Sequence, residues 1–310
     1  MSGKIITEKL SQNWEIPADA FGLRADVYLQ RKLGRVSRVR AQKIIDNKDF
    51  LLDEQKVKPS QKVKVGQKAS LFRFSPDTVQ DIKNIEIRVI QDNKDFIVLD
   101  KPYNLNVHPS ANSLYKTLTY WLKNKYPNYK INPSHRLDKD TSGAIICSKN
   151  IAMDRYLKDL FFKKKVTKIY LAVVKGHLAK STIINFPLSF SDNLKIRMVH
   201  DEYGKKAITK VKPVKYFASV DRTLVMCKPY TGRQHQIRVH LSLINHPLVG
   251  DKLYGQSDEF FKMVCQKEEA ALAKLEHVRH ALHAYRLKLT INNHFYSFTA
   301  AIPQDFYLLF

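Results

Sequence analysis

The chain has 310 residues, of which 44% are hydrophobic and 26% charged, as is usual for a folded protein of one large or two unequal domains. Its 53 lysines and arginines outnumber its 29 aspartates and glutamates, for a net charge of +24. Such an excess favours a polyanionic partner, because each neutralised phosphate releases condensed counterions. An anionic membrane would satisfy the same charge, but no basic amphipathic helix with a lipid-facing aromatic side is evident. A basic surface without function is the remaining alternative.

The N-terminus and the cysteines bear on where the protein acts. The first nine residues, MSGKIITEK, contain no apolar core of signal-peptide length, and no run approaches the roughly 18 apolar residues of a membrane span. The cysteines Cys147, Cys227 and Cys265 are far apart and form no CxxC motif. This pattern predicts neither a disulfide framework nor a zinc ribbon. We therefore expect a cytoplasmic protein.

A small module is expected near the N-terminus. Residues 1–14 are predicted to form a loose polar tail, and residues 15–75 the module itself. Ala25, Leu29 and Leu33 recur every four residues, which places them on one face of a helix.

Capping residues and short apolar runs predict the remaining elements of the module. Gly34 suits the C-terminus of the first helix, and Ser37 suits the N-cap of a second. Short strands are predicted at Phe50–Leu52 and at Val63–Val65, the latter ending at Gly66.

The two predicted helices of this module carry a dense basic segment without any acidic residue. A solvated helical surface is the usual interpretation of such a run. Here the density at two consecutive helix ends predicts a face that binds phosphates. Its members are Arg31, Lys32, Arg35, Arg38, Arg40 and Lys43.

Residues 76–84 lack periodicity and are predicted to form a linker to a larger domain at residues 85–310. Alternation of Ile85, Ile87 and Val89 predicts a half-buried strand at its start. Strand and helix runs do not alternate strictly afterwards, so we expect an α+β fold with a mixed, largely antiparallel sheet and flanking helices. Further elements are predicted at Phe96–Leu99 (a strand), Leu114–Lys125 and Met153–Lys164 (helices).

One nine-residue segment of the larger domain gives the strongest indication of chemistry. It reads HRLDKDTSG from His135 to Gly143 and places Asp138 between a basic pair and a Thr-Ser-Gly turn. For an isolated aspartate, capping of the turn would be the simplest interpretation. The segment resembles the HRLD-x-x-TSG signature of the ribosomal large-subunit type of pseudouridine synthase, in which this aspartate is catalytic.

Further segments resemble the same family, in the family's order, over roughly residues 15–305. In the first of them Asn104 stands where the family has glycine, and asparagine tolerates the positive φ of such a turn. The resemblance implies the pseudouridine synthase fold. The segments are Lys101–Pro109, Lys168–Gly176, Gly204–Thr209, Thr231–His240, His246–Asp251 and Arg279–Ala284.

The N-terminal module resembles the α-L RNA-binding module named after ribosomal protein S-four. The similarity lies in Gly22–Leu29, Ser37–Ile45 and Val57–Gly66, whereas Asp53 and Glu54 replace the family's Asn-Gly hairpin turn. This second resemblance implies an RNA partner. It favours large-subunit ribosomal RNA as the substrate, with transfer RNA as the alternative.

The resemblance also implies roles for residues of the catalytic site. Asp138 would act at the anomeric carbon of the sugar, either as a nucleophile or as a base that removes a sugar proton, and the sequence does not decide between the two. Arg233 would keep this carboxylate ionised, and Tyr170 would stack on the uracil. Arg136 would fill the gap left by the flipped uridine, and Ile237 would line the uracil pocket.

Other charged residues near these motifs have less specific roles. Lys163, Lys164 and Lys165 form a basic cluster that we expect to bind phosphates beside the flipped base. The histidines His135 and His235, like His240, have no neighbouring carboxylates in a ligand pattern, so no metal is expected. Because the reaction is an isomerisation, no cofactor is expected either.

Two other classes of function remain open at this level. A ribosome-assembly factor on the same scaffold would bind RNA without changing it covalently. A nucleoside or glycoside hydrolase would use a pair of carboxylates, for which Asp140 is the only near partner of Asp138. We expect an RNA isomerase that acts as a monomer.

Overall fold

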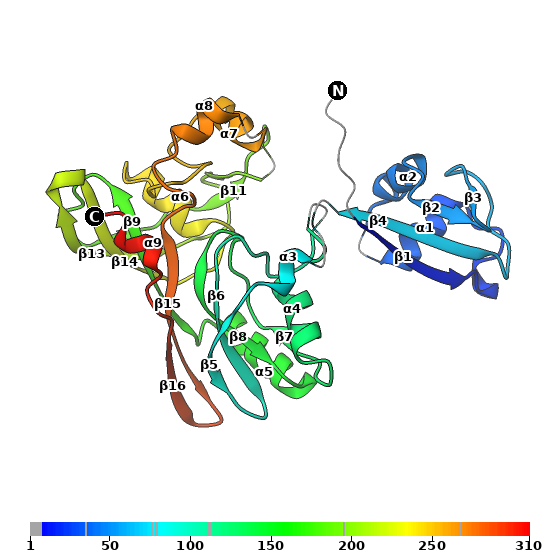
Figure 1. The fold of residues 1–310 in the computed structure, drawn as a ribbon, viewed down its shortest axis with the longest axis horizontal. Coiled ribbons are helices and arrows are strands. Elements are labelled where there is room, and N and C mark those ends of the chain that lie inside the picture. The colour runs from blue at the N-terminus through cyan, green and yellow to red at the C-terminus, as the bar shows by residue number, and fades with distance from the viewer. Residues whose placement is uncertain are drawn as a thin grey trace. The chain divides into compact units, whose positions relative to one another are not determined.

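A computed structural model of the chain describes residues 8–34, 36–75, 77, 80–110, 113–194, 196–266 and 268–310. The described residues form two compact units, one comprising those up to 81 together with 113–115, and the other comprising the remainder. Figure 1 shows both units, with the smaller one at the blue end of the colour scale. No helix in this described part is long and apolar enough to cross a membrane.

The smaller unit packs two helices against a four-stranded sheet. Helices α1 (Ala25–Leu33) and α2 (Arg38–Asp46) supply one side of its core. Ala25 and Leu29 are fully buried in one cluster with Phe50, which confirms the predicted helical face. The strands lie in the order β1 (Glu8–Glu15), β4 (Lys68–Ser75), β2 (Phe50–Leu52) and β3 (Gln55–Lys56).

The predicted helix boundaries of this unit are confirmed. Gly34 has a φ of 64° and its N–H donates back into α1, while the hydroxyl of Ser37 accepts the N–H of Arg40 at 3.2 Å. The turn that replaces Asn-Gly also works. Asp53 and Glu54 have φ angles of 49° and 64°, so the hairpin of β2 and β3 keeps the positive φ values that its twist requires.

Two predictions for this unit are wrong. Residues 8–14 belong to β1, whose backbone pairs with β4 along its whole length, and a partner so distant in sequence leaves no local pattern to recognise. Residues 1–7 of the predicted tail lie outside the described residues. Val63–Val65 is not a strand. The backbone of Val63 forms hydrogen bonds with the loop before α1, and Gly66, with a φ of 78°, turns the chain before β4 begins.

The larger unit is built on a ten-stranded sheet among the described residues. All of its strand pairings are antiparallel except that of β15 with β8, which confirms the predicted mixed, largely antiparallel sheet. In order, its main path is β10 (Thr182–Ile184), β13 (Thr209–Phe217), β14 (Arg222–Pro229), β9 (Thr167–Lys175), β15 (Leu282–Ile291), β8 (Ser142–Ser148), β6 (Phe96–Lys101) and β5 (Arg88–Asp92). Beside it lie β7 (Asn132–Pro133) on β8, β16 (His294–Thr299) on β15, and the separate hairpin of β11 (Leu188–Phe190) and β12 (Met198–His200).

Apolar side chains cover both faces of the central strands. In β6, Phe96 and Val98 pack with α5, whereas Ile97 and Leu99 pack in the cluster that contains α4. Burial on both faces explains why β6 and β8 are continuous apolar runs. The helices of this unit are α3 (Gln80–Lys83, at its boundary), α4 (Leu118–Lys125), α5 (Ile151–Phe162), α6 (Gln236–Leu243), α7 (Asp258–Cys265), α8 (Glu269–Ala273) and α9 (Gln304–Tyr307).

The start of this unit differs from the sequence prediction. The linker expected at 76–84 contains α3, and positions 76, 78 and 79 lie outside the described residues. The first strand begins at Arg88 rather than Ile85. Its register shifts between Val89 and Gln91, and the side chain of Val89 is exposed, so the alternation did not mark the buried face.

Candidate active site

Asp138 lies on the loop between β7 and β8, and backbone hydrogen bonds fix this loop. The carbonyl of Asp138 accepts the N–H of Thr141 at 3.1 Å, which closes a turn. The carbonyl of Lys139 accepts the N–H of Leu105 at 3.2 Å and the buried ammonium of Lys101 at 3.1 Å. The peptide group of Lys139, next to Asp138, is therefore held both by the backbone of Leu105 and by the side chain of Lys101.

At two turn positions of the motifs, the backbone conformation explains which residue type is present. Gly143 has a φ of 114°, and a Cβ atom there would lie 2.3 Å from the carbonyl oxygen of Ala284 on the adjacent β15. Glycine is thus required for β8 to pair with β15. Asn104 has a φ of 56°, which confirms that asparagine maintains the turn at the family's glycine position.

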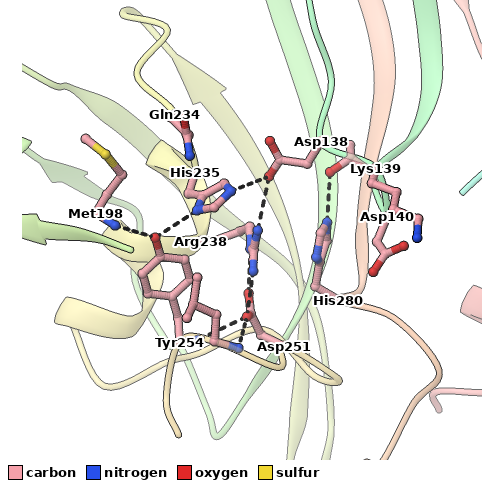
Figure 2. Close-up of polar contacts among 12 residues, drawn as sticks. Asp138, Lys139, Asp140, Met198, Gln234, His235, Arg238, Asp251, Tyr254 and His280 are labelled. Atoms are coloured by element: carbon pink, nitrogen blue, oxygen red, sulfur yellow. Dashed lines mark hydrogen bonds and ion pairs between the residues drawn. The ribbon is translucent and has the colours of Figure 1, made fainter. Parts of the chain in front are cut away.

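One oxygen of the Asp138 carboxylate is held by Arg238, a residue of α6 (Figure 2). Arg238 Nη1 donates to Asp138 Oδ2 at 3.2 Å. The assignment of this role to Arg233 was wrong. Arg233 lies in the loop before α6, where its Nε donates to the carbonyl of Lys206 at 3.1 Å. Helix α6 begins between the two arginines, and this boundary determines that Arg238, not Arg233, points toward the Asp138 carboxylate.

Arg238 is itself fixed by a second carboxylate. Its Nε and Nη2 donate to the two oxygens of Asp251 at 2.7 and 2.9 Å, and its guanidinium carbon lies 5.0 Å from the centre of the Tyr254 ring. Asp251 also accepts the backbone N–H groups of Leu253 and Tyr254. This bidentate pair leaves Nη1 aimed at Asp138 in a single orientation.

Two histidines complete the surroundings of Asp138. His235 Nε2 lies 3.9 Å from Asp138 Oδ2, and its Nδ1 lies 2.9 Å from the hydroxyl oxygen of Tyr254. His280 Nε2 lies 2.9 Å from the hydroxyl of Thr141 in the same loop. Figure 2 shows both rings beside the carboxylate.

The electrostatics keep the carboxylate charged and the histidines neutral. Burial alone would raise the pKa of Asp138, but the charge of Arg238 outweighs burial and holds this pKa below its ordinary value. Burial lowers the pKa of His235 to about 4 and that of His280 to about 3. At neutral pH the Asp138 carboxylate is therefore an anion flanked by two uncharged imidazoles.

Asp138 opens into a cavity of 710 Å³. Arg136, Tyr170, Arg233 and Ile237 all line it, so the sequence-predicted site residues are gathered at one place although Arg233 does not hold the carboxylate. Burial raises the pKa of Tyr170, so its phenol stays protonated. The other lining residues are Ser134, His135, Leu137, Thr141, Phe161, Phe162, Lys164, Val166, Lys168, Pro229, Tyr230, Thr231, Gly232, His235, Gln236, Arg238 and Leu282.

The predicted lysine cluster is only partly at this cavity. Lys164 and Lys168 line it, whereas Lys163 forms an ion pair with Asp159 at 2.8 Å. Lys165 is exposed and is not among the lining residues. A phosphate beside the cavity would therefore meet Lys164 and Lys168 first.

Most of the predicted basic face of the smaller unit is exposed. Arg31, Lys32, Arg40 and Lys43 are exposed. Arg38 differs, because its Nε donates to Asp26 at 3.1 Å and so joins the two helices. The predicted member Arg35 lies outside the described residues.

Sequence reasoning missed the residues that orient the carboxylate. Arg238 lies between the apolar residues Ile237 and Val239, and a buried arginine requires a carboxylate partner. That pattern could have identified it, and Asp251 in the following motif was the available partner. The histidines were expected to be structural or RNA-facing. Within the described residues, no group of three histidine, cysteine or acidic side chains could hold a metal ion.

Two family models match the chain. The RNA pseudouridylate synthase model matches residues 95–243, which include Asp138 and all of α6. The S4 domain model matches residues 23–68, which lie within the smaller unit.

Curated relatives are similar over nearly the whole chain. An RNA pseudouridine synthase of Helicobacter pylori strain J99 is 33% identical over 285 residues, covering 90% of this chain and 92% of the relative. Ribosomal large subunit pseudouridine synthase D of Buchnera aphidicola from Acyrthosiphon pisum is 33% identical over 294 residues, covering 92% of each.

Solved structures of two human proteins have a similar fold. The human RNA pseudouridylate synthase domain containing 1 protein superposes with a TM-score of 0.58 at 25% identity, covering 74% of this chain and 86% of that one. The human domain containing 4 protein shares the fold, with a TM-score of 0.55 at 22% identity over 71% of this chain and 92% of that one. From the site, the family model and the relatives together, the chain belongs to the RNA pseudouridine synthase family.

Proposed function

We propose that this chain converts specific uridines of large-subunit ribosomal RNA to pseudouridine, with Asp138 as the catalytic group. The observation that carries the proposal is an ionised carboxylate, fixed by Arg238 at one oxygen, at the wall of a cavity that also contains Tyr170. Relatives named as large-subunit enzymes support the choice of RNA. The S4 domain supports RNA binding outside the cavity.

The reaction breaks the bond between uracil N1 and the anomeric carbon of the ribose, and forms a bond from uracil C5 to that carbon. C5 then loses its proton and N1 gains one, so the atoms balance without any oxidant. Asp138 can serve this reaction as a nucleophile at the anomeric carbon or as a base toward a sugar proton. In both cases Arg238 keeps it anionic, and protonated Tyr170 offers a ring face to the uracil.

Access to Asp138 requires the uridine to leave its stack. Arg136 lines the same cavity and is the residue proposed to fill the vacated position, with Ile237 against the uracil. A groove of 340 Å³ shares Lys164, Val166, Pro229, Tyr230 and Thr231 with the cavity and adds two further lysines. The lysines of this groove, Lys164, Lys206 and Lys228, suit the phosphates on one side of the flipped nucleotide.

We also propose that the enzyme acts in the cytoplasm as a monomer. The three cysteines are free, and two of them are buried, which suits a reducing compartment. Size-exclusion chromatography with light scattering tests the oligomeric state.

Nucleoside analysis tests the proposed function. The purified chain is incubated with large-subunit ribosomal RNA, small-subunit ribosomal RNA, transfer RNA or ribosomal particles. The RNA of each sample is then digested, and its nucleosides are separated chromatographically. The proposal predicts pseudouridine from large-subunit RNA without free uracil. Free uracil would indicate a hydrolase, conversion of transfer RNA alone would correct the substrate, and unchanged nucleosides in naked RNA and in ribosomal particles would favour an assembly factor.

A further inference from the structure

The contacts of the Asp138 carboxylate are unequal between its two oxygens. Arg238 Nη1 at 3.2 Å and His235 Nε2 at 3.9 Å both face Oδ2. Among the described residues, no side-chain hydrogen bond or ion pair of Asp138 involves Oδ1. Figure 2 shows both dashed lines meeting at one oxygen while the other points away from the arginine. One oxygen is thus anchored and the other is available.

The hydrogen bonds behind His235 determine where its proton lies. The hydroxyl oxygen of Tyr254 accepts the backbone N–H of Met198 at 2.9 Å and lies 2.9 Å from His235 Nδ1. A phenol has a single proton to donate. Tyr254 is buried, and Nδ1 of His235 is the acceptor that this proton reaches among the described residues. Nδ1 therefore accepts, and a neutral ring must carry its proton on Nε2, the nitrogen that faces Asp138.

The backbone holds the ring in this place. His235 has a φ of 52° and is the N-cap residue of α6, so it lies in the left-handed region directly before the helix that carries Arg238. Its ring meets the ring of Tyr254 edge to face, with centroids 5.7 Å apart. The two groups that face Oδ2 are thus placed by one short segment of chain.

We propose that His235 is a positioning residue whose Nε2–H, directed by Tyr254, donates to Oδ2 of Asp138 when RNA fills the cavity. This inference rests on the proposed function of Asp138. The distance of 3.9 Å is longer than a hydrogen bond, and such catalytic contacts commonly shorten when the substrate binds. Oδ2 is then the anchored oxygen, and Oδ1 is the one that reacts.

The different roles of the two Asp138 oxygens apply to either mechanism. As a nucleophile, Oδ1 would bond to the anomeric carbon while Oδ2 kept its two donors. As a base, Oδ1 would take the sugar proton and become the O–H of a neutral carboxylic acid, while Oδ2, now its carbonyl oxygen, kept its two donors. In both cases, before Asp138 reacts, the uncharged imidazole of His235 stabilises the carboxylate with a hydrogen bond. It does so without adding a second positive charge, which would lower the reactivity of the carboxylate.

The tautomer of His235 can be measured without any activity assay. Nitrogen-15 NMR of histidine-labelled protein distinguishes a protonated from an unprotonated ring nitrogen, and His235→Asn identifies the signals, since asparagine tolerates the left-handed backbone. Wild type is expected to show Nε2 protonated and Nδ1 unprotonated at pH 7. Tyr254→Phe is expected to give a mixture of tautomers. A wild-type Nδ1–H tautomer would overturn the proposal.

The kinetic consequence is measured under single-turnover conditions with saturating RNA. We expect His235→Asn to lower the rate about tenfold or more, and Tyr254→Phe to lower it less, both with unchanged RNA affinity. Tyr216→Phe is the matched control, because it removes a hydroxyl that bonds Asp221 and lies outside the cavity. A rate for His235→Asn within twofold of wild type would contradict the proposal.

The pH profile separates positioning from a general loss of structure. Removing a donor from Oδ2 makes the anion less stable, so the acid limb of the rate should move to higher pH in both site variants and stay in place in Tyr216→Phe. An unmoved limb in His235→Asn would contradict the role. If wild type lacked isomerase activity altogether, the proposed function would fail while the NMR result still reported the tautomer. The other ionisable groups that face the pair and are unchanged in all of these variants are Lys101, Tyr170, Arg238, Asp251 and His280.

Discussion

Two aspartates with arginine partners, one in each unit, differ in how their oxygens are used. Asp26 in α1 is fully buried, and both of its oxygens accept hydrogen bonds, from Arg24, Arg38 and Gln42 among others. Asp138 keeps 28% of its side chain exposed and is held at Oδ2. A carboxylate with both oxygens occupied fixes one helix to another. A carboxylate with one free oxygen beside a cavity can react.

The same electrostatic balance applies to both groups. Burial would raise the pKa of Asp26, and bonds from Arg24, Gln42 and Arg38 lower it below its ordinary value. For Asp138, burial is outweighed chiefly by Arg238. An ionised carboxylate is therefore not by itself a sign of catalysis. The free oxygen and the adjoining cavity distinguish the second case from the first.

The largest expected effect comes from removing Arg238. Arg238→Met leaves Asp138 and Asp251 without their shared cation, so we expect the single-turnover rate to fall about 10²–10³-fold. Arg233→Met is the matched control and should lose much less, because Arg233 bonds a carbonyl rather than the carboxylate. A greater loss in the Arg233 variant would restore the assignment made from sequence.

Charge reversal on the smaller unit should affect binding rather than chemistry. Changing Arg31, Arg40 and Lys43 together to glutamate should weaken RNA binding and lower the slope of log affinity against log salt by roughly 2–3. The single-turnover rate at saturating RNA should not change. Filter binding at several salt concentrations measures the slope, and an unaltered slope would argue against a phosphate-binding face there.

Asp26→Asn should lower stability without lowering the chemical rate. Its hydrogen bonds to charged partners are lost or weakened, at a cost of about 1–3 kcal/mol, reduced toward the lower value because Arg24 and Arg38 are half-exposed. Denaturant unfolding followed by the fluorescence of Trp14, which lies in this unit, measures the change. A lower single-turnover rate at full folding would show that the two aspartates are not as different as we argue.

The smallest effect is the pH dependence of that stability difference. Because the folded pKa of Asp26 lies below its ordinary value of 3.8, its contribution is fully present above pH 3.8 and is lost as the pH falls toward the folded pKa. The unfolding free energies of wild type and Asp26→Asn should therefore differ by a constant amount from pH 7 to 5 and converge below 3.8. A difference that grew on acidification would have the wrong sign.

Local patterns predicted the parts of this molecule that local geometry decides. The left-handed Gly34 and the cap at Ser37 follow from residue chemistry, as does the positive φ of Asn104. The lining residues Arg136, Tyr170 and Ile237 came from motif resemblance, since nothing in their own sequence surroundings brings them to one cavity.

The failures arose where distant segments decide. Strand β1 forms because its backbone pairs with β4 along its whole length, and no periodicity in residues 8–14 indicates a strand. The choice between Arg233 and Arg238 depends on where α6 begins and on Asp251, which the sequence places in another motif. The role of His235 depends on Tyr254 and on the backbone of Met198, which meet only in the folded chain.

The most direct test of the central claim is tritium release from large-subunit ribosomal RNA labelled at carbon five of uracil, with wild type compared with Asp138→Asn. Carbon five loses its hydrogen when the new carbon–carbon bond forms. We predict release by wild type and none by the variant, although the variant binds the RNA equally well. Release by both proteins would contradict a catalytic role for Asp138.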